Sequence, residues 1–126
     1  MSPSPSIQLG PEFTQALSWK ARIISVHDFP AGQGISYGST YVTSKQEKIG
    51  VMPIGYGDGF RRIDNQQVLV GGRRVNVVGR VCMDQSMLQL DGVPGVKVGD
   101  EVVLIGRQDQ ESISVDEVAD RWGTIN

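Results

Sequence analysis

The chain has 126 residues with a formal net charge of −2, one cysteine and one histidine, and 39% of the residues are hydrophobic. This length supports a single domain, and the nearly balanced charge gives no electrostatic basis for binding nucleic acid. One cysteine excludes an intramolecular disulfide, and together with one histidine it is too little for a metal site. No apolar stretch approaches the ~18 residues of a membrane span and no secretion signal is evident, so we expect a reduced, cytoplasmic domain without membrane contact.

The N-terminal part of the chain predicts a lead-in followed by a strand. Residues 1–18 are expected to be a flexible linker, because proline and serine at the density of residues 1–10 resist both helix and sheet. A short helical turn fits residues 11–19. Residues 20–29 then predict the first strand of a domain that spans residues 19–126.

Two further segments predict strands. Residues 35–43 are rich in β-branched and aromatic residues, which puts Tyr37, Ser39 and Tyr41 on one face at a period of two. Residues 51–54 form a short apolar run that ends in three alternate glycines with a tyrosine and an aspartate between them. Loops at the end of a rigid strand often carry function. An ordinary turn, whose tyrosine packs and whose aspartate caps, is the simpler interpretation of this loop taken alone.

The second half of the chain predicts more strands. Gly71 and Gly72 between two strand-like runs are typical of a tight hairpin over residues 68–78. Another strand is expected over residues 101–105. About seven short strands with frequent turn signals and no alternation of strand and helix favour a mainly all-β fold, as a small β-barrel or Greek-key-like domain or a sandwich.

One helix is well specified near the C-terminus. Ser114 and Glu117 have the spacing of a capping box, and Gly123 supplies a stop. Between them lies an apolar stripe with helical period. Its members are Val115, Val118, Ala119 and Trp122.

Several common kinds of active site are excluded by what the sequence lacks. His27 has no Gly-x-Ser-x-Gly elbow to pair with, and no phosphate-binding Gly-x-x-x-x-Gly-Lys is present. The glycines at 55–59 are not followed by the helix signal that a dinucleotide loop requires. Tyrosine, arginine, aspartate and backbone amides are the groups that remain.

Three segments are more specific when they are taken together. They read Ser-Tyr-Gly-Ser-Thr-Tyr at 36–41, Pro-Ile-Gly-Tyr-Gly-Asp-Gly at 53–59 and Gly-Arg-Val-Cys-Met-Asp-Gln at 79–85. In this order and at these separations they resemble the C-terminal β-domain of the pyridoxal-phosphate-dependent alanine racemases. The resemblance extends over residues 19–126, and the third segment is its most specific part. Supporting segments lie at 98–102, 104–107 and 113–118.

The resemblance implies an acid/base role for one tyrosine. Racemisation takes a proton from one face of an α-carbon and delivers another to the opposite face, so two groups flank the substrate. In the family one group is the lysine that holds the cofactor as a Schiff base, and the other is the tyrosine that corresponds to Tyr37. A free tyrosine has a pKa near ~10 and needs charged neighbours to act at neutral pH. Those neighbours lie in the other domain, and His27 does not match them.

Further residues receive roles from the same resemblance. The backbone N–H of Met83 corresponds to the donor that holds the substrate carboxylate. Tyr56, Arg62 and Arg80 correspond to residues that line the entrance to the site. Asp84 is expected to pair with an arginine of that wall, and without the resemblance Arg80 and Asp84 would be interpreted as a structural pair.

Part of the implied enzyme lies outside this sequence. The family's cofactor lysine belongs to an N-terminal (β/α)₈ barrel of about 250 residues. We expect the chain to stop before the final arm that reaches the cofactor phosphate, and to show neither racemase activity nor stable cofactor binding alone. None of its lysines stands in the family's lysine motif. They are Lys20, Lys45, Lys48 and Lys97.

The sequence therefore predicts the C-terminal domain of a bacterial alanine racemase. It is expected to work with the barrel of its own subunit and of the partner in a homodimer, and to interconvert L- and D-alanine for cell-wall synthesis. A serine racemase of the same architecture is one alternative. A non-catalytic β-barrel that serves as an interaction module is another, although it has no need of Tyr37 and Met83 in combination. The first hypothesis requires the Tyr37 hydroxyl and the Met83 amide to converge on one rim.

Overall fold

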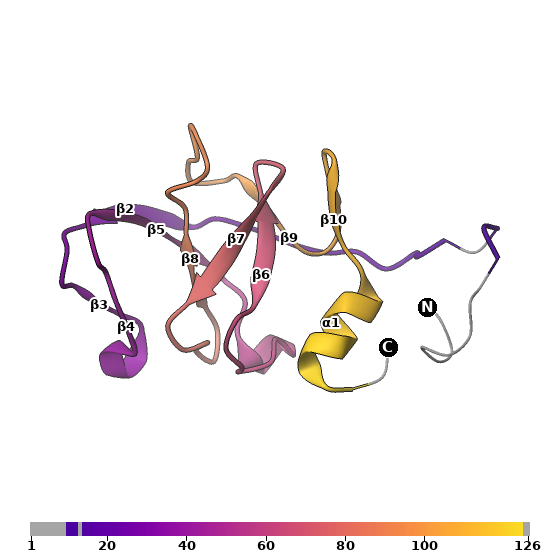
Figure 1. The fold of residues 1–126 in the computed structure, drawn as a ribbon, viewed down its shortest axis with the longest axis horizontal. Coiled ribbons are helices and arrows are strands. Elements are labelled where there is room, and N and C mark those ends of the chain that lie inside the picture. Colours follow the sequence, from indigo (N-terminus) through magenta and orange to yellow (C-terminus); the bar gives the residue numbers. More distant parts are fainter. Residues whose placement is uncertain (1–9, 13, 125–126) are drawn as a thin grey trace.

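The computed structural model of the protein describes residues 10–12 and 14–124 (Figure 1). Residues 10–12 and 14–18 lie outside helices and strands. Residues 11 and 12 form a turn, no helix occurs in the described part of residues 11–19, and Trp19 already belongs to the first strand. The expected flexible lead-in over residues 1–18 falls partly outside the described residues, and the domain boundary at residue 19 stays a prediction.

Strands make up most of the regular secondary structure of the described residues, and a single α-helix lies at their C-terminal end. The strands are β1 Trp19–Arg22, β2 Ser25–Phe29, β3 Gly34–Ile35, β4 Tyr41–Val42, β5 Glu47–Met52, β6 Gln67–Val70, β7 Arg73–Val78, β8 Ser86–Gln89, β9 Glu101–Gln108 and β10 Glu111–Ile113. Two single 3₁₀ turns, η1 Tyr37–Ser39 and η2 Tyr56–Asp58, and the helix α1 Val115–Trp122 complete the fold. The expectation of a mainly all-β domain with one short helix is confirmed.

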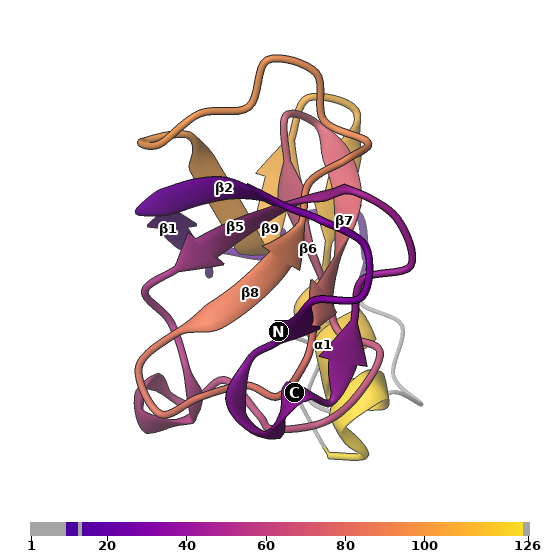
Figure 2. The same cartoon turned by 90° about the vertical axis from the view of Figure 1, so that its left-hand side faces the viewer.

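One antiparallel sheet with two edges that meet forms the body of the domain (Figures 1 and 2). Its strand order is β1-β9-β6-β7-β8-β5-β2, with β10 added to β9. The chain passes from one edge strand to the other through Ile23 and Ile24. The Ile23 N–H donates to Asp100 O at 3.0 Å and the Ile24 N–H to Val51 O at 2.9 Å. Because β1 and β2 are the two edge strands and only these two residues separate them, the sheet curls into a small barrel.

The passage through Ile23 and Ile24 shows that the prediction of one strand over residues 20–29 is wrong. Residues 20–29 do not form a single strand, since β1 pairs with β9 and β2 pairs with β5. The predicted hairpin is confirmed, with Gly71 and Gly72 at φ of 60° and 73° between β6 and β7. Its turn is fixed to β9, because the Gly72 N–H donates to Gln108 Oε1 at 2.8 Å.

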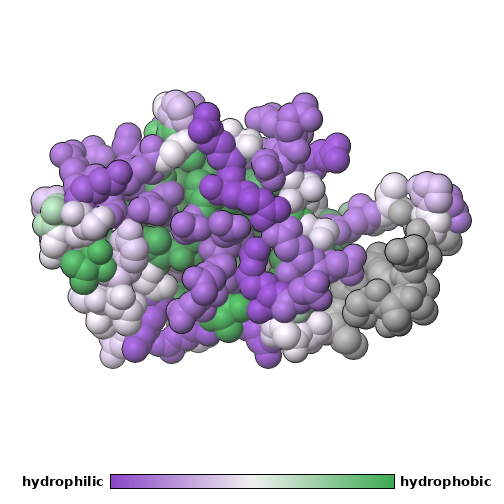
Figure 3. Space-filling model, in the orientation of Figure 1, coloured by the Kyte–Doolittle hydropathy of each residue, from purple (hydrophilic) through white to green (hydrophobic). Residues whose placement is uncertain are grey.

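Strand β9 is apolar on both faces and separates two hydrophobic cores. Val102 and Leu104 pack in the larger core inside the barrel. Val103 and Ile105 alternate with them and pack in a second core beneath α1. Burial on both faces explains why residues 102–105 of this strand form a continuous apolar run rather than an alternating one. Hydrophilic residues predominate on the face of the molecule in Figure 3, where hydrophobic residues occur in separate small areas.

Helix α1 begins and ends where the capping signals predict. Ser114 Oγ accepts a hydrogen bond from the Glu117 N–H at 3.0 Å, and Gly123 ends the helix at a φ of 63°. Arg74 on β7 ties this helix to the sheet. Its guanidinium pairs with Glu117 and with Glu111 on β10, and the contact with Arg74 holds the pKa of Glu117 below its ordinary value.

The segment 35–43 is not the strand that its composition predicts. Ser36, Gly38 and Ser39 have φ of 68°, 76° and 48°, which takes the backbone out of the extended region. The chain instead forms β3, the turn η1 and β4. Tyr37 and Tyr41 therefore do not share a face of one strand. Tyr37 is exposed, whereas Tyr41 is half-buried.

Tyr41 belongs to a buried polar cluster that closes this segment. Its Oη donates to Glu47 Oε2 at 2.6 Å, and Glu47 is only 1% exposed. Gln89 Nε2 and the Ser44 N–H also donate to the Glu47 carboxylate, at 3.2 and 3.1 Å. The Tyr41 hydrogen bond holds the pKa of Glu47 below its ordinary value, because it stabilises the charged form. Burial and the Glu47 carboxylate raise the pKa of Tyr41 to about 12.

We expect Tyr41 to give a late alkaline titration step. Because its pKa is raised from 10.0 to about 12, its contribution to folding stability is complete below pH 10 and is lost as the pH rises toward 12. The ultraviolet absorbance of tyrosinate, followed against pH, should contain a step near pH 12 that Tyr41→Phe removes. A step that persists in Tyr41→Phe would contradict the assignment.

Glu47 should contribute to the loss of stability at acidic pH. Its lowered pKa stabilises the fold fully above the ordinary value of 4.5, and this contribution is lost as the pH falls through the lower folded-state value. Glu47→Gln is expected to lose about 1–3 kcal/mol at neutral pH, because one buried acceptor becomes a donor. Urea unfolding at neutral and at acidic pH should then show a smaller acid-induced loss in the variant. An equal loss in both proteins would refute this role.

Candidate functional site

Three loops meet at one end of the barrel (Figure 2). They comprise residues 36–38, 55–58 and 79–84, and together we call them the rim. The segment 79–84 lies between the other two loops, because hydrogen bonds join it to both. On one side Ser36 Oγ donates to Arg80 O at 2.6 Å. On the other side the N–H groups of Tyr56 and Gly57 donate to Cys82 O at 2.9 Å and Met83 O at 2.8 Å.

The contact between η2 and the segment 79–84 depends on a glycine. A Cβ on Gly55 would lie 2.2 Å from Cys82 O and 2.5 Å from Met83 O, so a larger residue does not fit without a shift. Asp58 Oδ2 accepts a hydrogen bond from the Gly55 N–H at 3.0 Å and closes the turn. The simpler interpretation of this loop is thus correct for the aspartate.

Large side chains project from the rim into solvent. The expectation of a packed tyrosine in the turn at residues 55–59 is therefore wrong for Tyr56. Tyr37 is 75% exposed, Met83 60% and Tyr56 49%. Neither the Tyr37 hydroxyl nor the Met83 N–H has a hydrogen-bond partner within residues 10–12 and 14–124. The structure therefore places Tyr37 and Met83 on adjoining loops and leaves both groups available to a ligand.

The predicted entrance residues are arranged less uniformly. The Arg80 side chain lies across η1, with Nη1 3.6 Å from the position that a Cβ on Gly38 would take. Arg62 is exposed in the loop after η2. Asp84 is also exposed and forms no ion pair with an arginine in the described part of the chain, so the expected pairing is absent there.

The loop after η2 is held by the helix. Arg61, and not Arg62, donates a hydrogen bond to Trp122 O. The Trp122 Nε1–H donates to Gln66 Oε1 at 2.7 Å, and Gln66 Nε2 donates back to Arg61 O. Phe60 packs edge-on against Trp122 with 6.4 Å between ring centroids. These contacts fix the stem from which Arg62 extends.

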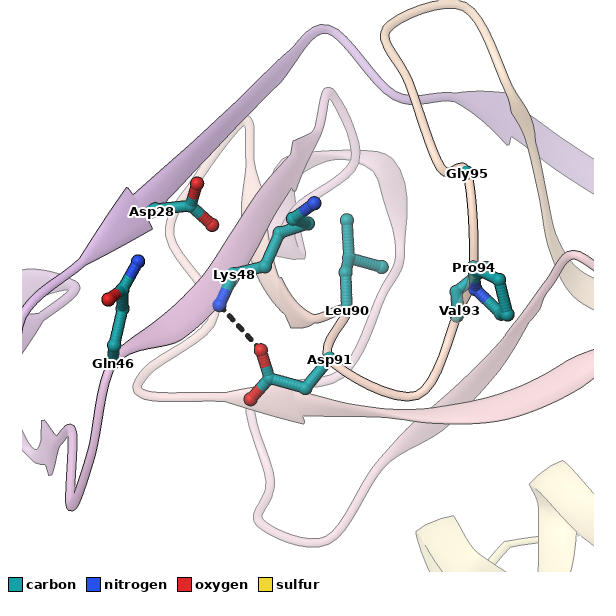
Figure 4. Close-up of a pocket in the computed structure, with 8 residues that line it drawn as sticks. All are labelled: Asp28, Gln46, Lys48, Leu90, Asp91, Val93, Pro94 and Gly95. Carbon is teal, nitrogen blue, oxygen red and sulfur yellow. Dashed lines mark hydrogen bonds between the residues drawn. The ribbon is translucent and has the colours of Figure 1, made fainter.

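One pocket on the described surface lies away from the rim. An open pocket of about 450 Å³ lies between β2, β5 and the loop after β8, and it is lined by Asp28, Lys48 and Asp91 among others (Figure 4). The Lys48 N–H in this pocket already donates a hydrogen bond to Asp91 Oδ1 at 2.7 Å. No cluster of three metal-ligating side chains occurs among the residues with a described position. The single described helix is too short and too polar to cross a bilayer.

Ser36 is the rim residue that the sequence did not identify. It stands beside the predicted tyrosine and carries the bond to Arg80 O. A serine in a Ser-Tyr-Gly segment gives no sequence signal of its positive φ, which only the structure reveals.

Comparison with known proteins gives consistent matches. The family model described as "Alanine racemase, C-terminal domain" matches residues 16–126. The alanine racemase of Halothermothrix orenii is 48% identical over 128 residues, which cover 100% of this chain and 34% of that protein. The alanine racemase of Carboxydothermus hydrogenoformans is 52% identical over 88% of this chain and 31% of its own. The chain thus spans about a third of the length of these curated relatives.

Solved structures agree with the sequence matches. The alanine racemase of Bacillus anthracis with bound L-Ala-P superposes with a TM-score of 0.87 at 44% identity, covering 97% of this chain and 32% of that one. The alanine racemase from E. faecalis gives a TM-score of 0.85 at 43% identity, covering 93% of this chain and 32% of that one. With a family model that extends over residues 16–126 and the same fold in solved relatives, the chain belongs to the family of alanine racemase C-terminal domains.

Proposed function

We propose that this chain provides one side of the active site of an alanine racemase. The Tyr37 hydroxyl acts as one of the two acid/base groups, and the Met83 N–H binds the carboxylate of the substrate. The observation that carries this proposal is the set of hydrogen bonds that holds two groups on adjoining loops of one rim: an exposed phenol and an amide without a partner among the described residues.

Each group suits its role for a physical reason. A proton moves between Tyr37 Oη and the α-carbon, and the exposure of this side chain allows a substrate held by another domain to approach it. The Met83 amide cannot rotate away, because its peptide segment is held on both sides by hydrogen bonds. A fixed donor of this kind binds a carboxylate without reorganisation.

The described residues fit work beside pyridoxal phosphate but do not anchor it. None of the four lysines is a rim residue, and Lys20 and Lys97 pair with Glu101 and Asp100 at 3.5 Å each. Residues outside this chain, in an N-terminal (β/α)₈ barrel, would hold the cofactor. When bound, the cofactor supplies an electron sink that stabilises negative charge at the α-carbon.

The entrance residues give the rim its selectivity in this proposal. Arg62 and Arg80 attract the carboxylate of an amino acid, and Tyr56 restricts the space for its side chain. L- and D-alanine are the substrates that suit a narrow entrance of this kind. We place the activity in the bacterial cytoplasm, in a homodimer whose partner subunit presents its barrel to this rim, with D-alanine used in the cell wall.

A chimeric enzyme tests the proposal. Residues 16–126 replace the matching segment of the Halothermothrix orenii alanine racemase, and the interconversion of L- and D-alanine is followed by optical activity. We expect turnover with pyridoxal phosphate bound, and a loss in kcat of about 10²-fold or more in Tyr37→Phe, since one proton transfer loses its group.

The controls separate the rival functions. Serine is assayed beside alanine, and preference for serine would overturn the substrate assignment. The 126-residue chain with added cofactor should give no turnover. A folded chimera without activity, or a Tyr37→Phe chimera that keeps full kcat, would leave a non-catalytic module as the better description.

Gly55→Ala should weaken substrate binding. Its new Cβ would press on Cys82 O and Met83 O and displace the amide that holds the carboxylate. We expect KM for alanine to rise about tenfold, the effect of one lost hydrogen bond to a charged group.

Gly92→Ala is the matched control, because a Cβ there meets no atom within 4 Å and its φ is not positive. Circular dichroism checks that both variants are folded. An unchanged KM in folded Gly55→Ala would show that the Met83 amide does not contact the substrate.

A further inference from the structure

The backbone of Ser36 adopts a conformation that its residue type rarely takes. Its φ is 68° and its ψ is 177°, a region that is essentially limited to glycine. Such a conformation persists only where the surrounding structure imposes it, and it is found preferentially at functional sites. Ser36 immediately precedes Tyr37, so the cause of its conformation bears on where the phenol lies.

The surroundings of Ser36 supply that cause. Its Oγ donates to Arg80 O at 2.6 Å, across 44 residues of sequence, and lies 3.8 Å from Cys82 Sγ. Gly79 makes room for it, because a Cβ on Gly79 would lie 2.6 Å from the Ser36 Cβ. The serine is thus seated against the segment that also carries the Met83 amide.

The position of Tyr37 follows from this seat. The Ser39 N–H donates to Ser36 O at 3.1 Å and closes η1 around the tyrosine. At its other end the segment is fixed by the Tyr41–Glu47 hydrogen bond of 2.6 Å. Between these two anchors the phenol is 75% exposed, so its own packing does little to place it.

We propose that Ser36 is a positioning residue, whose hydroxyl holds the loop of Tyr37 in register with the Met83 amide. This inference rests on the proposed function for its catalytic consequence, although the tie itself is a property of the chain alone. Ser36 touches no reacting atom and acts through its neighbour.

Cys82 gives a direct readout of the tie. It is the only cysteine in the chain, it is half-buried, and its thiol lies beside the Ser36 hydroxyl. In the 126-residue chain we expect Ser36→Ala and Ser36→Gly to raise the rate of Cys82 alkylation about fivefold, the effect of one lost hydrogen bond. Mass spectrometry of the peptide that carries Cys82 measures the rate.

Two variants distinguish the hydroxyl from the backbone. Ser36→Gly relieves the backbone conformation but lacks the donor, so it should behave as Ser36→Ala does if the hydrogen bond is what matters. Ser39→Ala is the matched control. This substitution removes the Ser39 hydroxyl, which lies in the same loop and has no hydrogen-bond partner among the described residues. Cys82 in this variant should be alkylated at the native rate. Native rates in both Ser36 variants would refute the tie.

The catalytic consequence is measured in the chimera that carries residues 16–126. Ser36→Ala and Ser36→Gly should lower kcat about tenfold or more while KM for alanine changes less than about twofold, because a misplaced phenol impairs proton transfer rather than binding. Ser39→Ala should keep the native kcat. Faster labelling with an unchanged kcat would overturn the positioning role and leave a purely structural one. An inactive native chimera would instead refute the proposed function, while the labelling arm would still decide whether the tie exists.

Discussion

The rim depends on one irregular segment, residues 79–84, that hydrogen-bonds to a different loop on each side. This segment belongs to no strand, so no sheet ladder satisfies its carbonyls. The Ser36 hydroxyl and the N–H groups of Tyr56 and Gly57 satisfy them instead. Three loops that are far apart in sequence therefore hold one another in place. The barrel beneath contributes by bringing their stems to the same end (Figure 1).

Local signals explain which parts of the fold the sequence predicts. Gly71 and Gly72 specify the hairpin, and Ser114 with Gly123 specifies the helix, because turns and caps are decided by adjacent residues. The prediction of one strand over residues 35–43 is wrong. The alternation of aromatic and β-branched residues there is typical of a strand, although the backbone does not form a single one. The positive φ of Ser36 accompanies contacts with Gly79 and Arg80, which are more than 40 residues away in sequence, so the composition of residues 35–43 does not predict it. The division of residues 20–29 into two strands likewise follows from closure of the barrel.

The candidate site was predicted only as far as its motifs resemble a family. The residues alone left tyrosine, arginine, aspartate and amides as the available groups, and the resemblance then selected Tyr37 and Met83. The structure places both residues on adjoining loops, and their roles stay a prediction. The pairing expected of Asp84 is absent among the described residues, because surface ion pairs are set by side-chain geometry that spacing does not encode. Ser36 was missed because its hydrogen bond is made to a residue 44 positions away in the sequence.

The two-sided burial of β9 bears on how the barrel avoids misfolding. If the register of β9 shifted by one residue, Val103 and Ile105 would take the places of Val102 and Leu104. Both hydrophobic cores would still be filled by apolar side chains. Hydrophobic burial therefore does not choose the alignment of this strand. The choice falls to directional bonds at its ends, such as the one from Gly72 to Gln108, which a shifted strand would leave unmade.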